Sequence, residues 1–286
     1  MRLYKLLVEE NFDIKKLTSF KIGGKIAKMI FPETVEEFVE ALQKYPDAFI
    51  AGNLSNTLVS SDGYDGAVIS TLGLNEIIIE GSNITAGAGI KGPKLAQTVA
   101  QKGLSGLEFM IGFPGSVGGE VYMNAGANGQ CVADVLKSAK IYCPEKGLIT
   151  LTDLEFGYRT SICQKKNYVV LEAEFELTPR EGVKEKMDEN LAFRKSHQPS
   201  LALPNCGSIF KNPEGNSAGR LLDECGVKGL SVGGVKVWEN HANFIVNNNN
   251  GTSQDVINLM REMQKRVKEK FDIELKPEIR FLGVEL

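Results

Sequence analysis

The sequence predicts an α+β protein, and three observations support that class. Strand and helix patterns alternate over about the first 60 residues, strand patterns dominate from there to about residue 179, and helices with short strands follow. A length of 286 residues corresponds to about two domains, and 42% apolar with 24% charged residues is ordinary for a globular enzyme. We expect boundaries that divide the chain into 1–60, 61–180 and 181–286.

The first part contains one helix and one loop of glycine and short polar residues. Thr34 and Glu37 fit a capping box at the start of a helix that reaches Lys44. Its apolar face has helical spacing: Val35, Phe38, Val39 and Leu42. A strand-type segment, 48–51, then leads into a loop of short polar residues: Gly52, Asn53, Leu54, Ser55, Asn56 and Thr57. Backbone amides and small polar donors at the end of a strand can cradle anionic oxygens.

The second part is expected to be built on a sheet. Its strand-type segments are 66–70, 76–80, 83–86, 139–143, 148–151 and 168–177. In the last of these, apolar residues alternate with glutamates, as in a half-buried strand: Leu171, Ala173, Phe175 and Leu177. One helix is predicted from Pro93 to Lys102, with proline in its first turn and Gly103 just past its end.

Glycines are concentrated between Gly112 and Gly129, where six occur in eighteen residues. Average usage of roughly 7% predicts about one. Glycine accumulates where the backbone needs a positive φ or approaches another body too closely for a Cβ. Together with the loop at 52–57, this stretch suggests a diphosphate held between two loops.

The third part is expected to be helical with short strands between the helices. A charged helix over 181–195 carries Val183, Met187, Leu191 and Arg194 at helical spacing. Two further helices are predicted over 217–225 and 252–270, the second with an apolar face formed by Val256, Met260, Met263 and Val267. Short strands are predicted at 208–211, 243–246 and 278–282, and the run Asn247–Asn250 is expected to be an exposed turn.

Composition excludes several classes of protein. A net charge of −3 without a basic stripe argues against a nucleic-acid partner. The N-terminus is not of the secretory type and no apolar run approaches the ~18 residues of a membrane span, so we expect a cytosolic protein without a membrane partner. Five widely spaced cysteines are typical of reduced, mostly buried thiols, and two histidines do not favour a histidine-rich metal site.

Two motifs are discounted on their context. Gly87–Gly92 matches Gly-x-Gly-x-x-Gly, but the segment after the following helix is too rich in glycine to be the parallel second strand of a Rossmann fold. Gly229–Gly233 matches Gly-x-Ser-x-Gly, but it follows a helix end and does not lead into a helix, as a nucleophile elbow requires. No Gly-x-x-x-x-Gly-Lys-[Ser/Thr] motif of a P-loop occurs.

Seven ordered segments resemble the UDP-N-acetylenolpyruvoylglucosamine reductase (MurB) family and span nearly the full chain. They are 18–24, 103–109, 112–127, 156–159, 207–213, 241–247 and 277–279. The resemblance implies a two-part FAD-binding domain of the vanillyl-alcohol-oxidase (PCMH) type and an α+β substrate-binding domain, with the C-terminal strand returning to the active site. It assigns to the flavin the residues Gly52, Asn53, Leu54, Ser55, Asn56, Thr57, Gly112, Pro114, Gly115, Ser116, Gly118, Gly119, Asn124, Ala125, Val170 and Arg280.

The family's reaction implies an NADPH-dependent reduction of an enolpyruvyl ether on a UDP-sugar, a step in peptidoglycan precursor synthesis. By resemblance, Arg159 and Glu278 stabilise the enol intermediate and Ser208 donates the proton. Substrate binding is assigned to Arg159, Arg194, Gln198, Lys211 and Asn212, while His241 is expected to be structural. No metal is implied, and a monomer or weak oligomer is expected.

Leu54 departs from the family pattern, which usually has the second glycine of its Gly-x-Gly-Ser-Asn loop at this position. We therefore expect the backbone at Leu54 to avoid a positive φ and its side chain to point away from the diphosphate. The chain resembles the compact branch of the family, without the extra tyrosine-bearing loop. Two rival functions are a flavin oxidase of the same fold acting on a hydroxy acid or sugar, and a non-catalytic nucleotide-sugar-binding protein.

Overall fold

The computed structural model describes residues 6–286, whose contacts group the chain into two compact units. The first unit contains the chain up to Glu9, Met29–Asn53 and Ala67–Arg194. The second contains Glu10–Lys28, Leu54–Gly66 and Lys195–Leu286. Both units are discontinuous in sequence, whereas the expected parts 1–60, 61–180 and 181–286 are continuous; that three-part division stays a prediction.

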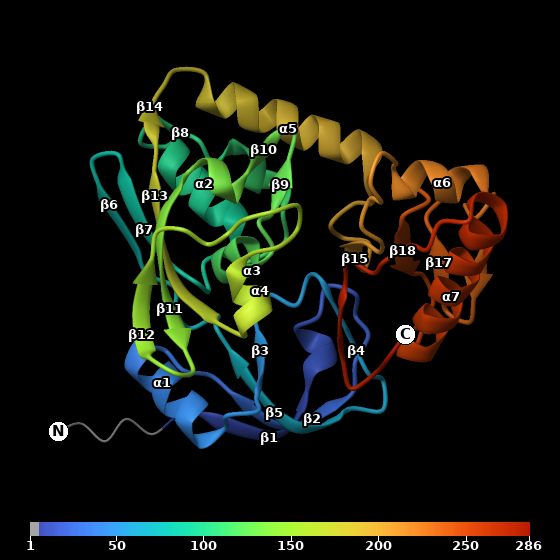
Figure 1. The fold of residues 1–286 in the computed structure, drawn as a ribbon, viewed down its shortest axis with the longest axis horizontal. Helices are drawn as coiled ribbons and strands as arrows, with labels where there is room; N and C mark the ends of the chain where they lie inside the picture. Colours follow the sequence, from blue (N-terminus) through green and yellow to red (C-terminus); the bar gives the residue numbers. More distant parts are fainter. Residues whose placement is uncertain (1–5) are drawn as a thin grey trace. The chain divides into compact units, whose positions relative to one another are not determined.

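A five-stranded antiparallel sheet forms the centre of the first unit (Figure 1). Its order is β12 (Gly147–Leu151), β11 (Leu136–Cys143), β13 (Val169–Glu176), β7 (Asn83–Gly87) and β6 (Ile77–Glu80). All five strands were predicted to within a few residues. The alternation along β13 is confirmed, because Leu171, Ala173 and Phe175 are fully buried. Ala173 and Phe175 pack in one apolar cluster, as the period of two requires, whereas Leu171 packs in another, next to a register shift in the β11–β13 pairing.

The expected helix 34–44 is α1 (Val35–Lys44), whose N-cap Thr34 accepts a hydrogen bond from the amide of Glu37. The Glu37 carboxylate accepts from the amide of Glu33 instead of closing the predicted capping box. Phe38, Ala41 and Leu42 bury the inner face of α1. The predicted strand is β3 (Phe49–Ala51), which pairs in parallel with β5 (Tyr64–Ser70).

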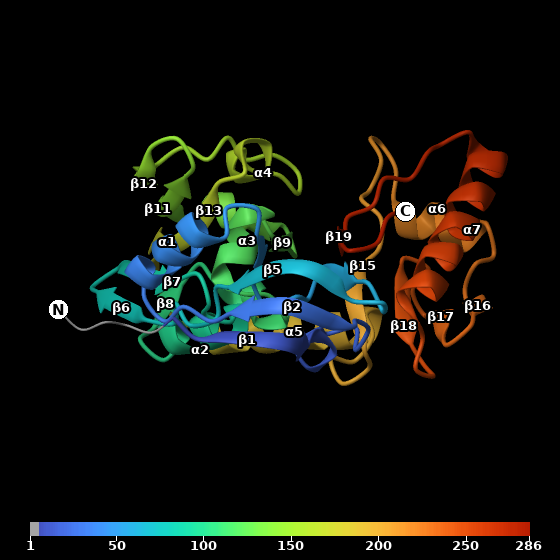
Figure 2. The ribbon, with the colours of Figure 1, turned by 90° about the horizontal axis from the view of Figure 1, so that it is seen from below.

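Two strands near the N-terminus were not predicted. They are β1 (Val8–Asp13) and β2 (Lys25–Ile30), and with β5 and β3 they form a sheet of order β1-β2-β5-β3. Figure 2 shows β1, β2 and β5 side by side. None of the residues Val8–Asp13 is buried, so β1 lacks the regular alternation that identifies a half-buried strand.

The Rossmann interpretation fails in the structure for the expected reason. The helix at Gly92 is α2 (Gly92–Ala100), and the next segment forms β8 (Leu104–Ser105). This short strand pairs antiparallel with β14 (Thr178–Pro179), not in parallel. The glycine stretch begins at the last residue of η2 (Glu108–Gly112) and contains α3 (Val117–Tyr122) and β9 (Gly126–Ala127). It is followed by β10 (Gln130–Cys131), η3 (Val132–Asp134) and, further on, α4 (Ile162–Lys166).

The charged helix is α5 (Val183–His197), and one of its expected inward residues is wrong. Val183 and Met187 are buried, but Leu191 is 37% exposed and Asn190 is buried in its place. The Asn190 amide donates to the carbonyl of Glu108 at 3.0 Å and accepts from Asn128 at 2.9 Å. Two hydrogen bonds to fixed partners make burial of this polar side chain favourable and turn Leu191 outward.

The second unit combines a four-stranded antiparallel sheet with two helices. The sheet order is β15 (Asn205–Ser208), β18 (Phe244–Asn247), β17 (Val235–Val237) and β16 (Ser231–Val232). The predicted helices are α6 (Ala218–Glu224) and α7 (Ser253–Phe271), and the expected apolar face of α7 is fully buried. The remaining elements are η1 (Ile14–Lys16) and a parallel pair formed by β4 (Thr57–Val59) and β19 (Arg280–Leu282).

Two predictions for this unit are wrong in part. The strand expected at 208–211 is displaced: β15 covers Asn205–Ser208. The residues after it bond to the C-terminal segment instead, where Phe210 pairs with Pro277 and the amide of Lys211 donates to the carbonyl of Lys276. Asn248–Asn250 are exposed and irregular, as predicted for the run 247–250, but Asn247 is buried in β18, where its side-chain amide donates to the carbonyl of Phe20 at 3.1 Å. The rejection of a nucleophile elbow is confirmed, since Gly229–Gly233 leads into the β16–β17 hairpin.

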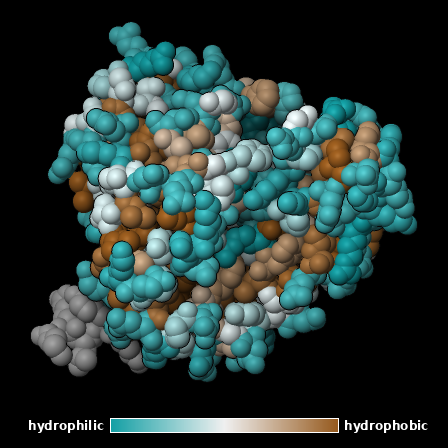
Figure 3. Space-filling view, in the orientation of Figure 1, coloured by the Kyte–Doolittle hydropathy of each residue, from teal (hydrophilic) through white to brown (hydrophobic). Residues whose placement is uncertain are grey.

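In the view of Figure 3, the right-hand edge of the molecule, where α6 and α7 lie, is mostly hydrophilic, with hydrophobic residues exposed beside it. Within residues 6–286, no helix combines the length and the apolar character needed to cross a membrane. The five cysteines are free thiols, and Cys143, Cys163 and Cys206 are buried.

Candidate functional site

The first half of the polar loop lies against the glycine stretch. The Asn53 side-chain amide donates to the carbonyl of Pro114. A Cβ on Gly52 would lie 2.5 Å from Ser116 Oγ, well inside van der Waals contact. The structure thus brings residues 52–53 next to residues 114–116, the two loops that the sequence analysis paired.

Ser116 carries a buried hydroxyl that lacks a hydrogen-bond partner among the described residues. Its side chain is 2% exposed, and it does not cap α3 although it occupies the N-cap position. An unpartnered buried polar group costs about 1–3 kcal/mol. An anionic oxygen beside Gly52 would accept a hydrogen bond from this hydroxyl, so the residues present here fit a diphosphate group.

Most glycines of the stretch contact protein atoms. A Cβ on Gly118 would meet the Ala88 side chain at 2.8 Å, and one on Gly112 would meet Cδ of Arg194 at 2.9 Å. Gly119 is more open, because a Cβ placed on it would lie 3.7 Å from Ser116 Oγ, an ordinary contact distance. Close helix packing therefore accounts for part of the glycine density, and positive φ accounts only for Gly129 at +79°.

The expectation for the Leu54 backbone is wrong. Leu54 has a φ of +48°, in the left-handed region that a glycine would occupy at little cost. This conformation costs a leucine roughly 1–2 kcal/mol. The side chain is only 4% exposed, and burial of a leucine contributes about 1.5–3 kcal/mol. Burial therefore offsets the strain and lets the loop keep its glycine-like path.

The second half of the loop is tied to the C-terminal segment. The Asn56 side chain donates to the carbonyl of Glu278 at 3.1 Å, and the Asn56 carbonyl accepts from the amide of Arg280 at 2.9 Å. Thr57 is the parallel partner of Arg280. Ser55 lies between these anchored residues and Leu54. Loop residues and the segment with Glu278 and Arg280 are therefore one hydrogen-bonded substructure of the second unit.

Arg159 lies in a tight turn that its neighbours support. Gly157 and Thr160 exchange two backbone hydrogen bonds, and Arg159 takes a φ of +54° between them. The guanidinium donates to the carbonyl of Gly126 at 3.0 Å. The neighbouring Tyr158 ring is 57% exposed, with its centroid 5.5 Å from the guanidinium carbon. A positive φ at a non-glycine residue is common at functional sites, because surrounding contacts must hold it.

Asn124 forms two side-chain hydrogen bonds to backbone groups. The Asn124 amide donates to the carbonyl of Gly157 at 3.0 Å and its oxygen accepts from the amide of Ala133. Asn124 thus holds the turn that contains Arg159.

The remaining residues assigned to the first unit have other surroundings. Ala125 follows Asn124 in sequence, and Val170 is buried in β13. Arg194 is partly buried against Gly112, and burial lowers its pKa from the usual value.

Ser208 and Glu278 come from distant parts of the sequence but lie on bonded backbone segments of the second unit. Ser208 ends β15, and the next residue, Ile209, accepts a hydrogen bond from the amide of Glu278 at 2.8 Å. Lys211 follows within the same paired segment. Asn212 accepts from the amide of Ala218 at the start of α6, so its side-chain oxygen already has a structural partner. Gln198 is partly buried just after α5.

Sequence reasoning missed Glu120 and Asn243. Glu120 is a charged residue type inside an otherwise small and apolar stretch, yet it is 3% exposed with neither carboxylate oxygen hydrogen-bonded among the described residues. Asn243 belongs to a segment that the family resemblance quoted without a role. Each is a polar residue in an apolar sequence context, which is a signal for a buried polar group.

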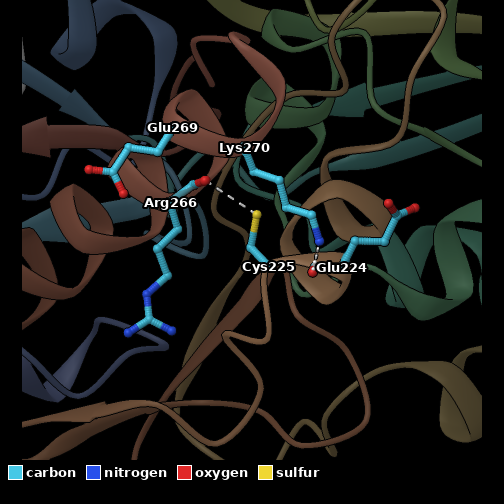
Figure 4. Close-up of a pocket in the computed structure, with 5 residues that line it drawn as sticks. All are labelled: Glu224, Cys225, Arg266, Glu269 and Lys270. Atoms are coloured by element: carbon cyan, nitrogen blue, oxygen red, sulfur yellow. Dashed lines mark hydrogen bonds between the residues drawn. The ribbon is translucent and has the colours of Figure 1, made fainter.

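A shallow pocket of about 350 Å³ lies at the ends of α6 and α7 (Figure 4). Its lining residues are Glu224, Cys225, Arg266, Glu269 and Lys270. The Cys225 thiol donates to the carbonyl of Arg266 at 3.5 Å, and Lys270 donates to the carbonyl of Glu224 at 2.6 Å. None of the residues predicted for catalysis or binding lines this pocket.

Two family models match the chain. The model of an FAD binding domain matches residues 26–152, and the model of the C-terminal domain of UDP-N-acetylenolpyruvoylglucosamine reductase matches residues 198–282. With the loop geometry around Gly52 and Ser116, the first match defines an FAD-binding protein of α+β fold, as predicted.

Curated relatives and a solved structure specify the family. Proteins named UDP-N-acetylenolpyruvoylglucosamine reductase from Clostridium perfringens (strain SM101) and Caldanaerobacter subterraneus subsp. tengcongensis are 41% and 40% identical to this chain. The alignments cover 99% and 96% of this chain and 98% and 93% of the relatives. The crystal structure of UDP-N-acetylenolpyruvylglucosamine reductase (MurB) from Thermus caldophilus matches with a TM-score of 0.82 and 34% identity, over 98% of this chain and 99% of that one. The chain belongs to the UDP-N-acetylenolpyruvoylglucosamine reductase family.

Proposed function

We propose that this chain reduces the enolpyruvyl ether of UDP-N-acetylglucosamine-enolpyruvate to UDP-N-acetylmuramate, with NADPH as the hydride donor. The observation that carries the proposal is the hydrogen-bonded pairing of the segments that contain Ser208 and Glu278, in a chain that matches the family over its full length. This reaction belongs to peptidoglycan precursor synthesis. The UDP-sugar is accordingly the substrate class, and a cytoplasmic location and a monomer or weak oligomer stay predictions.

The FAD group is supported by the cradle in the first unit. Gly52 leaves room beside Ser116 Oγ, and Asn53 holds the two loops together through Pro114. A bound FAD supplies hydride to the terminal carbon of the enolpyruvyl group after reduction by NADPH. We propose that Gly52, Asn53 and Ser116 hold its diphosphate. The other residues assigned to the flavin by resemblance remain part of this proposal.

The protein's own residues manage charge and a proton. Addition of hydride to the terminal carbon breaks the carbon–carbon double bond and moves an electron pair toward the substrate carboxylate. We propose that Arg159 and Glu278 stabilise this enolate-like species, with Arg159 contributing its positive charge. Preorganised groups of this kind contribute several kcal/mol because they need no reorganisation during the reaction.

The second carbon then needs a proton, which we assign to Ser208. Its O–H bond breaks as the new C–H bond forms, and the serine recovers a proton from solvent. A serine hydroxyl is a weak acid, so this transfer depends on the strong basicity of the enolate and on accurate placement of the hydroxyl. Arg194, Gln198, Lys211 and Asn212 are proposed to contact the substrate.

The test separates the two half-reactions by stopped-flow absorbance of the flavin. Ser208→Ala is expected to leave reduction by NADPH unchanged and to slow reoxidation by the enolpyruvyl sugar about 10²–10⁴-fold. Unchanged reoxidation would remove Ser208 from the mechanism. A protein that takes up no FAD, or whose flavin NADPH does not bleach, would overturn the proposed function as a whole. The rival flavin oxidase is not favoured, and bleaching by NADPH under anaerobic conditions separates the two.

A further inference from the structure

The backbone just after Ser208 is hydrogen-bonded along both of its edges. One edge faces the C-terminal segment: Ile209 accepts from the amide of Glu278 at 2.8 Å, and the amide of Lys211 donates to the carbonyl of Lys276 at 2.9 Å. Phe210 and Pro277 form an antiparallel bridge between these bonds. The path of the chain from Ser208 to Lys211 is therefore set relative to Glu278 on this side.

On the other edge, Ser208 pairs with Phe244 in the β15–β18 sheet, and Asn243 holds the two residues that follow Ser208. The Asn243 side-chain oxygen accepts from the amide of Phe210 at 3.0 Å, and its side-chain nitrogen donates to the Phe210 carbonyl at 2.8 Å. The backbone carbonyl of Asn243 also accepts from the amide of Ile209 at 3.0 Å. A primary amide offers one acceptor and one donor side by side, so it satisfies both polar groups of Phe210 as a neighbouring strand would.

Asn243 is itself fixed in place. It is 4% exposed, and its backbone amide donates to Nδ1 of His241 at 3.2 Å. The His241 ring packs edge-on against Phe244, with centroids 4.8 Å apart. Burial lowers the pKa of His241, which favours the neutral ring whose Nδ1 can accept this bond. His241 thus supports Asn243, in line with the structural role expected for it.

We infer that Asn243 is a positioning residue for proton delivery: its side chain clamps Phe210 and thereby sets the path of the chain that follows Ser208, while its backbone carbonyl holds Ile209. The inference rests on the proposed function, in which the Ser208 O–H bond breaks as the substrate C–H bond forms. A displacement of about 1 Å at a reacting group can cost on the order of 10²-fold in rate. Hydride transfer from NADPH does not use this hydroxyl, so only the second half-reaction depends on the clamp.

Asn247 provides a matched control on the same strand. It is 9% exposed, and its side chain also bonds backbone groups on both sides, donating to the carbonyl of Phe20 and accepting from the amide of Gly251 at 2.8 Å. Its partners do not adjoin Ser208 in sequence. Asn247→Ala therefore removes a comparable set of buried hydrogen bonds without releasing the Ser208 segment.

The experiment measures both half-reactions and thermal unfolding of the FAD-loaded full chain for Asn243→Ala, Asn247→Ala and Ser208→Ala. Asn243→Ala is expected to change flavin reduction by less than about twofold and to slow reoxidation by the enolpyruvyl sugar about 10²-fold, with a larger solvent deuterium isotope effect as proton transfer becomes limiting. Asn247→Ala is expected to lower the melting temperature similarly and to leave both half-reactions within about twofold.

Equal slowing of both half-reactions by Asn243→Ala, or selective slowing by Asn247→Ala, would overturn the inference. If Ser208→Ala leaves reoxidation unchanged, the proposed role of Ser208 fails instead. If Asn243→Ala does not fold, Asn243→Asp decides the question, because a protonated carboxyl offers the same donor and acceptor pair as the amide. As the pH falls, the flavin reoxidation rate of Asn243→Asp should then rise toward that of wild type, while the rate of Asn247→Asp serves as the control. If the ratio of these two variant rates does not change with pH, the result would contradict the clamp.

Discussion

Glu120 should make this protein less stable as the pH rises. The residue lies in the first turn of α3 and is 3% exposed, and its carboxyl fills the space that a Cβ on Gly92 or Gly115 would occupy. Burial raises its pKa from the usual 4.5 to about 8. The favourable field of a helix N-terminus stabilises a carboxylate by only about 0.3–1 kcal/mol. Desolvation is the larger effect, so Glu120 is protonated at neutral pH.

The sign and size of the effect follow from linkage. The native pKa lies above the unfolded one, so the native state binds more protons between pH 4.5 and 8 and the free energy of unfolding falls as the pH rises through that range. A rise of about 3.5 pH units, at 1.36 kcal/mol per unit, corresponds to about 5 kcal/mol. This is comparable to the whole stability of many domains, about 5–15 kcal/mol.

The perturbation is Glu120→Gln, which keeps the shape of the neutral acid and removes its titration. Urea unfolding of flavin-free protein, followed by circular dichroism from pH 5 to 9, measures the free energy of unfolding of wild type and variant. The free energy of unfolding of the variant should rise relative to that of wild type by about 1.36 kcal/mol per pH unit up to about pH 8, and this difference should stay constant above pH 8. Glu80→Gln, at an exposed position on β6, is the control and should give a flat difference. Parallel curves for wild type and Glu120→Gln would refute a buried neutral Glu120.

Two further predictions concern the polar loop. Gly52→Ala should weaken FAD binding at least about tenfold, as measured by flavin fluorescence quenching, because its Cβ would lie 2.5 Å from Ser116 Oγ; adding Ser116→Ala should restore part of the affinity, and an unaltered dissociation constant for Gly52→Ala would argue against this cradle. Leu54→Gly should unfold with a free energy about 1 kcal/mol higher than Leu54→Ala, because both lose the buried side chain but only glycine relieves the φ of +48°. The reverse order of the two variants in urea unfolding would restore the expectation of a negative φ.

Prediction from sequence worked best where one face of an element is buried. The alternation in β13 and the apolar stripe of α7 identified both elements and their inward residues, since burial at period 2 or 3.6 leaves a pattern in the chain itself. It failed for Leu191 and Asn190. There, a polar side chain found two fixed partners, and partners distant in sequence leave no periodic signal.

Family resemblance and structure contribute different parts of the site. Motifs in the sequence identified the FAD-binding and reductase character, and the comparisons confirm both. Their catalytic assignments, Arg159, Ser208 and Glu278, stay predictions that the half-reaction experiments test. The positive φ of Leu54 was predicted wrongly because the sequence shows the cost of that conformation but not the burial that offsets it.

By itself, the sequence determined the fold class, the two loops suited to a diphosphate and the family of the chain, because these depend on periodicity, glycine placement and motif order. Only the tertiary structure decided that Ser116 is buried without a partner, that Glu120 is desolvated, and that Asn243 clamps the backbone after Ser208. Each of these depends on which distant groups surround a side chain, and desolvation and hydrogen bonding act through that surrounding, not through neighbours along the chain.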